Sequence, residues 1–263
     1  MQATTTNGLV LHFEDVGPGD TPALVFSNSI GTEFRIWREL VTLLPDELRV
    51  ICYDKRGHGL SECPTGPYAM NDHMRDLAGL LDRLEVKQAT IIGLSVGGMI
   101  AQSLAVARPD LVRGLVLCDT AHKIGTPEMW ETRIQTIRQR GIGVLSEPIL
   151  ERWFSASYRN ERPEELAVWR AMLTRTPVEG YIGTCAAIRD ANLTESSRAL
   201  DLPTVCVVGS EDGATPPALV RSAADLIGAG FVEIEGPGHL PCIESPGALA
   251  EIIGRFLREN GIV

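Results

Sequence analysis

The chain has 263 residues, of which 44% are hydrophobic and 22% are charged, and its formal net charge is −10. This composition is typical of a globular protein with one large core, and the negative charge argues against nucleic acid or an anionic membrane as a partner. No apolar run approaches the roughly 18 residues of a membrane-spanning helix, and the first residues lack the basic and apolar regions of a secretory signal.

Short apolar runs typical of β-strands recur along the chain. Seven strands are predicted, over residues 9–15, 23–28, 49–54, 89–94, 114–119, 204–209 and 231–236. After the first, they are rich in Val and Ile and almost continuously apolar. This is the pattern of parallel strands that are buried on both faces.

Helices are predicted between these strands, over residues 72–84, 97–107, 218–227 and 248–260. In the first of them, Met74, Leu77 and Leu81 follow the i, i+3, i+4 spacing of an amphipathic helix. The alternation of strands and helices with short connections predicts an α/β fold. It has a mostly parallel central sheet with helices on both faces.

The alternation stops between about residues 121 and 191, where every segment is typical of a helix. We predict an inserted all-helical cap over residues 122–190 and a core domain formed by residues 1–121 and 191–263. Three of the four tryptophans, Trp130, Trp153 and Trp169, lie in this insertion. Aromatic side chains anchor ordinary cores as well, but their concentration favours a cap that lines a pocket over a purely structural lobe.

A serine between two glycines marks the junction of the strand at 89–94 and the next helix, in the sequence Gly93-Leu94-Ser95-Val96-Gly97. A strand-to-helix turn of this kind exposes the serine hydroxyl at the carboxyl edge of the sheet, where open α/β folds bind ligands. The following helix start offers free N–H groups to an oxyanion. This setting favours Ser95 as a nucleophile over a small residue in a tight turn.

A serine nucleophile needs a base, which in turn needs an orienting acid, and here the chain order is Ser, acid, His. Two histidines, His122 and His239, follow Ser95. His239 comes just after the last predicted strand and is the predicted base, whereas His122 is assigned a pocket-lining or simply polar role. Asp212 is the predicted acid, and Asp119 is the alternative, because each follows a predicted strand that ends at the same edge.

Two backbone N–H groups are predicted to hold the oxyanion. One belongs to Val96, and the other to Ile30 in the loop after the strand at 23–28. Gly31 gives this loop the backbone freedom that it needs. The neighbouring Ser29 is a predicted substrate contact.

Several motifs resemble the α/β-hydrolase superfamily: "YDKRGHGLS" at residues 53–61, "GLSVGG" around Ser95 and "GPGH" before His239. A more specific resemblance covers most of the chain. The segments "SNSIGT", "CDTAHKIGTPEMW", "ERWF" and "EGYIGTCAAIRDANL" are similar to the 3-oxoadipate enol-lactonases of the β-ketoadipate pathway. That family usually has Asn where Asp119 stands, Ala where His122 stands and a Ser-Asn pair near residues 241–242. These departures concern substrate preference rather than the fold.

The resemblance implies a serine hydrolase that opens the lactone ring of 3-oxoadipate enol-lactone through an acyl-enzyme, in aromatic catabolism, without metal or cofactor. Such a substrate carries a carboxylate, which a chain of net charge −10 must bind through a local cation. Arg133 is the predicted cation, because it lies three residues after Trp130 on the same helix face. Trp130 and Trp153 are the predicted apolar walls.

Two other functions stay open. One is a carboxylesterase, or a lactonase of other specificity, and the other is a hydrolase-like protein that only binds a ligand. The six scattered cysteines show no C-x-x-C spacing, and we expect reduced thiols in a cytoplasmic protein. The histidines show no metal-ligand spacing, and the sequence predicts no oligomeric state.

Overall fold

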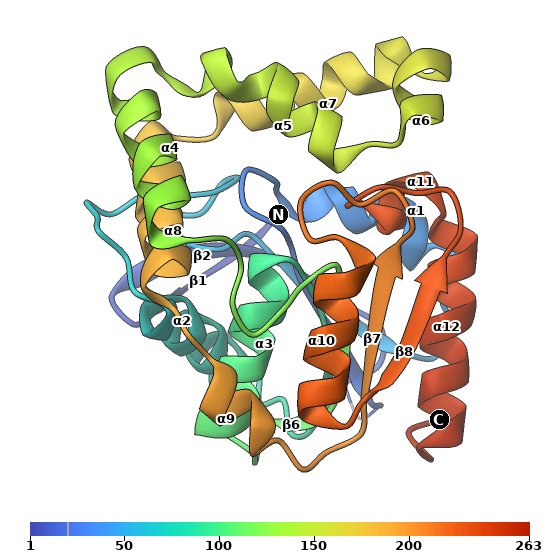
Figure 1. Cartoon of the computed structure of the whole chain (residues 1–263). Helices are drawn as coiled ribbons and strands as arrows, with labels where there is room; N and C mark the ends of the chain where they lie inside the picture. Colours follow the sequence, from blue (N-terminus) through green and yellow to red (C-terminus); the bar gives the residue numbers. More distant parts are fainter. Residues whose placement is uncertain (20) are drawn as a thin grey trace.

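An eight-stranded sheet organises the protein (Figure 1). The computed structural model describes residues 1–19 and 21–263. The strands are β1 (Gln2–Thr6), β2 (Leu9–Val16), β3 (Ala23–Ser27), β4 (Arg49–Tyr53), β5 (Ala89–Leu94), β6 (Val112–Cys118), β7 (Thr204–Gly209) and β8 (Gly230–Ile234). Their order is β1-β2-β4-β3-β5-β6-β7-β8, and the strands from β4 to β8 pair in parallel. This confirms the predicted α/β fold with a mostly parallel sheet.

Strand β1 is missing from the sequence prediction. It pairs antiparallel with β2 at the edge of the sheet, and β2 in turn pairs antiparallel with β4. Its sequence, QATTT, contains no large apolar residue, and most of it is exposed. An edge strand that covers little of the core carries no apolar alternation by which to recognise it.

Helices cover both faces of the sheet, as predicted. Those of the core are α1 (Arg38–Val41), α2 (Met70–Arg83), α3 (Val96–Ala107), α9 (Thr194–Arg198), α10 (Pro217–Ile227), α11 (Pro241–Glu244) and α12 (Pro246–Glu259), with a 3₁₀ helix, η1 (Phe34–Trp37), before α1. Figure 1 shows β7 and β8 between α10 and α12. The short helices α1, α9 and α11 were not predicted, because four or five residues are too few to show a helical period.

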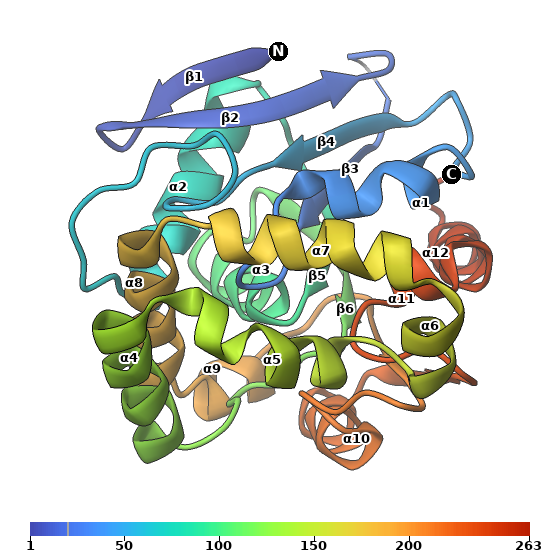
Figure 2. The same cartoon turned by 90° about the horizontal axis from the view of Figure 1, so that it is seen from above.

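The segment between β6 and β7 is helical, with α4 (Pro127–Arg140), α5 (Ser146–Trp153), α6 (Ala156–Glu161), α7 (Pro163–Arg175) and α8 (Val178–Asp190), and a 3₁₀ helix, η2 (Ile142–Leu145). The arrowheads of β7 and β8 point toward the edge that α5, α6 and α7 cover (Figure 1). From above, α5 and α7 run side by side across the core (Figure 2). The exact division of the chain into a core and a cap stays a prediction.

Local sequence accounts for the start of this helical segment. Thr126 accepts a hydrogen bond from the Met129 N–H at 3.2 Å, and Pro127 occupies the first position of α4. Helix α4 then packs along α8. Over the described residues, none of the helices is both long and apolar enough to cross a membrane.

Candidate active site

Ser95 occupies a strained turn between β5 and α3. Its φ and ψ are 58° and −121°, a conformation that side-chain-bearing residues rarely adopt. The Ser95 N–H donates to the Cys118 carbonyl at 3.0 Å, and the Ser95 carbonyl accepts from Thr120 Oγ1 at 2.6 Å. These bonds to β6 and the residues after it hold the turn, so the predicted nucleophile stands at the carboxyl edge of the sheet.

Gly97 lets α3 begin this close to the neighbouring strand. A Cβ atom at Gly97 would lie 1.9 Å from the Ser27 carbonyl oxygen, a backbone atom of β3. We therefore expect Gly97→Ala to lower the free energy of unfolding by about 3 kcal/mol or more, since overpacking against backbone has little room to relax. Urea unfolding measures this change.

Gly247 provides the matched control for Gly97. It lies in the first turn of α12, it is exposed, and a Cβ atom added there would meet no other atom within 4 Å. Gly247→Ala should leave the protein as stable or up to about 1 kcal/mol more stable, because Ala has the higher helix propensity. Equal effects of the two substitutions would contradict the steric explanation.

Asp212 and His239 are hydrogen-bonded to each other. His239 Nδ1 lies 2.9 Å from Asp212 Oδ2, and both side chains are buried. Asp212 Oδ1 accepts the N–H groups of Ala214 and Thr215 at 2.7 and 3.0 Å, and Thr215 Oγ1 lies 2.6 Å from Oδ2. Burial would raise the pKa of Asp212, but the charge of His239 and the hydrogen bonds from His239 and Thr215 together outweigh burial and lower it. A carboxylate is thus aimed at the imidazole.

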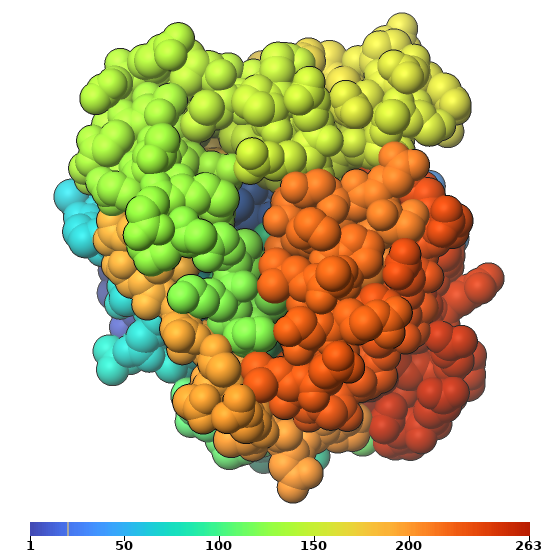
Figure 3. All heavy atoms as spheres, viewed as in Figure 1, coloured from blue at the N-terminus to red at the C-terminus, as the bar shows by residue number. Residues whose placement is uncertain are grey.

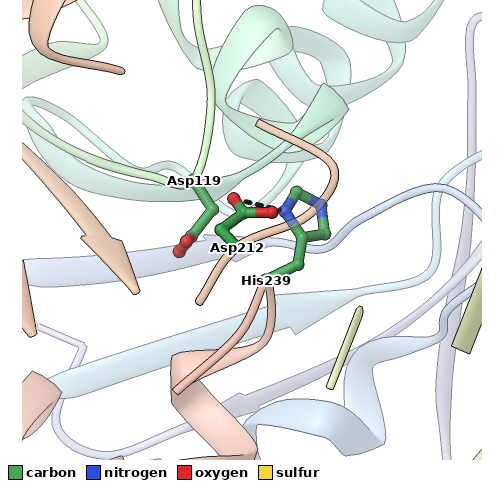
Figure 4. Close-up of side chains that lie close together, drawn as sticks. All are labelled: Asp119, Asp212 and His239. Atoms are coloured by element: carbon green, nitrogen blue, oxygen red, sulfur yellow. Dashed lines mark hydrogen bonds and ion pairs between the residues drawn. The ribbon is translucent and has the colours of Figure 1, made fainter. Parts of the chain in front are cut away.

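Asp119, the alternative acid, does not bond to His239 in this structure. Figure 4 shows Asp212 between Asp119 and the imidazole. Asp119 Oδ1 accepts the Gly209 N–H at 3.0 Å, and its Oδ2 is buried without a partner among the described residues. Burial, and then the charge of Asp212, raises the pKa of Asp119 well above its usual range. The geometry favours Asp212 as the orienting acid.

These three side chains also form a group that could be considered for a metal ion. One potential ligand atom from each of Asp119, Asp212 and His239 lies within 4.8 Å of the others. However, His239 Nδ1 and Asp212 Oδ2 already bond to each other, and burial raises the pKa of Asp119, which disfavours its charged form. A hydrogen-bonded network explains the group better than a cation site.

The loop after β3 holds the second predicted oxyanion donor. Neither the Ile30 N–H nor the Val96 N–H has an acceptor within the part of the chain that the structure describes. The next N–H, of Gly31, donates to His58 Nε2 at 3.0 Å. Ser29 is fully buried, and no hydrogen-bond partner of its Oγ is found in residues 1–19 and 21–263. The Ile30 N–H is therefore free to bind a ligand, while His58 holds the neighbouring Gly31 N–H. A substrate contact by Ser29 stays a prediction.

The helical segment closes directly onto this loop. A Cβ atom at Gly31 would lie 2.7 Å from Leu173 Cδ1, 2.9 Å from Tyr181 Cε2 and 3.3 Å from the Trp153 ring. The Trp153 carbonyl also accepts the His239 N–H at 2.8 Å. Trp153, a predicted wall, thus contacts both the loop and the predicted base. The sequence did not single out Leu173 or Tyr181, because only the packing of α7 and α8 brings them here.

A second link joins the helical segment to the loop that carries His239. Glu244 Oε1 accepts the Gly238 N–H at 2.9 Å, and Glu244 Oε2 accepts from Ser155 Oγ at 2.5 Å. Burial raises the pKa of Glu244, although these bonds oppose the rise. One carboxyl group therefore ties the residue before His239 to the start of α6.

Trp130 and Arg133 are stacked. The guanidinium carbon of Arg133 lies 4.8 Å from the centre of the Trp130 ring, and Trp130 Nε1 donates to the Ile124 carbonyl at 2.7 Å. Trp130 is buried, so its indole anchors α4 besides supporting the arginine. Within the described residues, Arg133 forms no ion pair with an acidic side chain.

Arg152 is a further cation that the sequence analysis missed. With Arg133 it lines a cavity of about 180 Å³ between α4 and α5. Both arginine charges act on the buried Tyr181 hydroxyl, for which no hydrogen-bond partner is found in the described part of the chain. Burial raises the pKa of Tyr181 to about 12, and the arginines oppose the rise. Figure 3 shows a hollow between the helical segment, in green and yellow, and the orange part of the core.

His122 lies at the start of the helical segment. Its carbonyl accepts the Leu193 N–H at 2.9 Å, and its Nδ1 is buried with no partner in the described residues. Burial, with the neighbouring Lys123 charge, lowers the pKa of His122. The backbone bond joins the two ends of the insertion, and over the described residues His122 forms no hydrogen bond with Ser95 or Asp212.

Comparison with known proteins extends this description. A model of the alpha/beta hydrolase family matches residues 23–252. The 3-oxoadipate enol-lactonase 2 of Acinetobacter baylyi is 32% identical over 97% of this chain and 95% of its own. The crystal structure of the enol-lactonase from Burkholderia xenovorans LB400 superposes with a TM-score of 0.94 at 36% identity, covering 98% of this chain and all of that one. A thermophilic esterase from Thermogutta terrifontis superposes with a TM-score of 0.89 at 32% identity, covering 98% and 97%.

Proposed function

Since the chain belongs to the alpha/beta hydrolase family, we propose that it is a serine hydrolase that opens the lactone ring of 3-oxoadipate enol-lactone to give 3-oxoadipate. The observation that carries the proposal is the buried Asp212–His239 pair at the sheet edge where Ser95 stands in its strained turn. The similarity to two enol-lactonases supports the choice of substrate.

The proposed reaction begins at Ser95. His239 takes the hydroxyl proton as Ser95 Oγ attacks the lactone carbonyl, and Asp212 orients the imidazole and offsets its positive charge. The N–H groups of Ile30 and Val96 hold the oxyanion. The ring C–O bond then breaks, and His239 returns the proton to the departing enolate oxygen. Water, deprotonated by His239, releases the acyl group as a carboxylate, and the enol becomes the ketone.

The carboxylate of the substrate is assigned to Arg133. This arginine is held by the Trp130 ring, has no ion-pair partner among the described residues, and shares its cavity with Arg152. The unpartnered hydroxyl of Tyr181 offers one more donor nearby. Trp153 and Leu173 supply an apolar cover over Gly31.

Arg133→Ala should lower kcat/KM on the enol-lactone by about 10- to 100-fold, since a hydrogen bond to a charged group contributes about 1.5–3 kcal/mol. On 4-nitrophenyl acetate, which has no carboxylate, the loss should stay under about threefold. Arg138→Ala, an exposed arginine of the same helix, is the matched control and should change neither rate. Equal losses of Arg133→Ala on both substrates would remove the carboxylate role.

The substrate itself is tested by comparing kcat/KM on the enol-lactone made from muconolactone with kcat/KM on simple esters. A clear preference for the enol-lactone supports the proposal. A preference for simple esters would instead favour a carboxylesterase, the alternative that the similarity to the Thermogutta esterase supports. A cytoplasmic location belongs to the proposal, because all six cysteines are free.

A further inference from the structure

Lys55 is a buried lysine outside the residues assigned so far. It follows β4, and its side chain is 1% exposed. Its Nζ donates to the Ser29 carbonyl at 2.6 Å, which is its one side-chain hydrogen bond over residues 1–19 and 21–263. A buried ammonium group is costly unless it is paired with a carboxylate. In the described residues Lys55 forms no ion pair with a carboxylate, so its ammonium group interacts with the Ser29 backbone carbonyl instead.

That carbonyl belongs to the peptide group that carries the Ile30 N–H. In a trans peptide the C=O and the N–H point in opposite directions, and Ser29–Ile30 is not among the cis bonds of the described chain. Lys55 therefore lies at the carbonyl end, while the free Ile30 N–H points the other way. Hydrogen bonds in a low-dielectric interior polarise one another, so a cation on the oxygen makes the N–H a stronger donor.

Other contacts fix the same loop without adding charge. Thr32 Oγ1 donates to the Ser29 carbonyl at 2.8 Å, and His58 Nε2 accepts the Gly31 N–H at 3.0 Å. Because His58 Nε2 is an acceptor, its proton is on Nδ1, which lies 3.1 Å from the Arg56 carbonyl. Of the groups that the structure describes around the Ser29 carbonyl, Thr32 is neutral and Lys55 is the one that carries a charge.

We infer that Lys55 is a positioning residue whose ammonium group orients and polarises the Ser29–Ile30 peptide toward the oxyanion. This inference rests on the proposed function, because the oxyanion forms only if Ser95 attacks a carbonyl. It assigns to the lysine of "YDKRGHGLS" a role in the rate of acyl transfer rather than in substrate choice.

The groups around Lys55 decide its charge. Burial lowers the pKa of Lys55 to about 7, although the Asp54 carboxylate opposes this. His58 and His73 are buried, and burial followed by the Lys55 charge holds the pKa of each well below its usual range, so both are neutral. Arg56 is occupied by Asp76, and residues 28–32 carry no titratable side chain. Raising the pH through neutrality therefore removes the proton of Lys55 and weakens the oxyanion donor.

The test compares 4-nitrophenyl acetate with its thionoester, in which sulfur replaces the carbonyl oxygen. Sulfur accepts hydrogen bonds weakly, so the ratio of the two kcat/KM values reports the strength of the oxyanion donors. Any effect of pH on the shared steps of proton transfer acts on both substrates alike and cancels in the ratio. For the unaltered protein we expect the ratio to fall about tenfold between pH 6 and pH 9, as Lys55 loses its charge.

Substitutions at Lys55 and Thr32 distinguish an effect of the Lys55 charge from structural support of the loop after β3. Lys55→Met should give a low ratio that does not change with pH, and Lys55→Arg a ratio that stays high to pH 9. Thr32→Val removes a neutral bond to the same carbonyl and should lower the ratio less than about threefold while keeping its pH dependence. Lys87→Met, at an exposed lysine, should match the unaltered protein.

The deciding comparison is made at pH 6, where Lys55 is charged. If Lys55→Met does not fold, Lys55→Gln takes its place. A ratio in that variant equal to the ratio of the unaltered protein overturns the role of Lys55 while leaving the serine hydrolase intact. If the protein hydrolyses neither these two substrates nor the enol-lactone, the proposed function is overturned, and the inference with it.

Discussion

Ser95→Ala is expected to lower kcat for ester hydrolysis by about 10⁶-fold, the order of the loss seen when a serine protease loses its nucleophile. The acyl-enzyme cannot form without Oγ, and the burst of nitrophenol from 4-nitrophenyl acetate should disappear. Among the described residues Ser95 Oγ makes no hydrogen bond, so the free energy of unfolding should change by less than about 0.5 kcal/mol. Stopped-flow absorbance and urea unfolding measure the two effects.

The control for this substitution is Ser103→Ala, eight residues further along α3. Ser103 Oγ donates only to the Met99 carbonyl within the helix, at 2.9 Å, and full activity should remain. A persistent burst in Ser95→Ala would assign the nucleophile elsewhere. Saturable ester binding without turnover, in both the unaltered protein and the variant, would identify a ligand-binding protein with the hydrolase fold.

Asp212→Asn should lower kcat by about 10⁴-fold, whereas Asp119→Asn should lower it by less than about tenfold. The first change removes the negative charge that offsets the imidazolium and favours the wrong tautomer of His239. The second replaces an acid whose charged form burial disfavours, because burial raises the pKa of Asp119, and an amide oxygen can still accept the Gly209 N–H. Steady-state kinetics on one ester measure both variants.

The pH profile of kcat gives a further expectation for Asp212. Since the pKa of Asp212 is lowered, its carboxylate stays charged through the neutral range and should add no step to the kcat profile there. A larger loss in Asp119→Asn than in Asp212→Asn would reverse the assignment and make Asp119 the orienting acid.

The sequence predicts those parts of the site that depend on local pattern. The turn at Ser95 follows from its glycines and from the change from a strand to a helix. Asp212 and His239 follow from their places after β7 and β8, because the carboxyl ends of parallel strands meet at one edge. Choosing Asp212 over Asp119 needed the structure, since both strand ends lie beside each other and only the hydrogen bond distinguishes them.

The rest of the site depends on contacts between distant segments. Tyr181 reaches Gly31 because α8 returns along α4 and α2, which no local spacing encodes. Lys55 lies in a conspicuous motif, yet its sequence position is typical of an exposed loop lysine. Its burial, and its bond to Ser29, arise from the way the loop after β4 folds under the loop after β3.

The bond between the Trp153 carbonyl and the His239 N–H has a consequence for how such a protein acquires new specificity. The end of α5 forms part of the proposed substrate cover and also supports the backbone of the predicted base. A substitution that makes room for a larger substrate by moving the last turn of α5 also displaces His239, because the Trp153 carbonyl holds the His239 N–H. Selection for a larger substrate at this position therefore acts on turnover at the same time, whereas changes along α4, around Arg133, leave that support in place. Divergence of substrate range should accumulate in α4 before it reaches the end of α5.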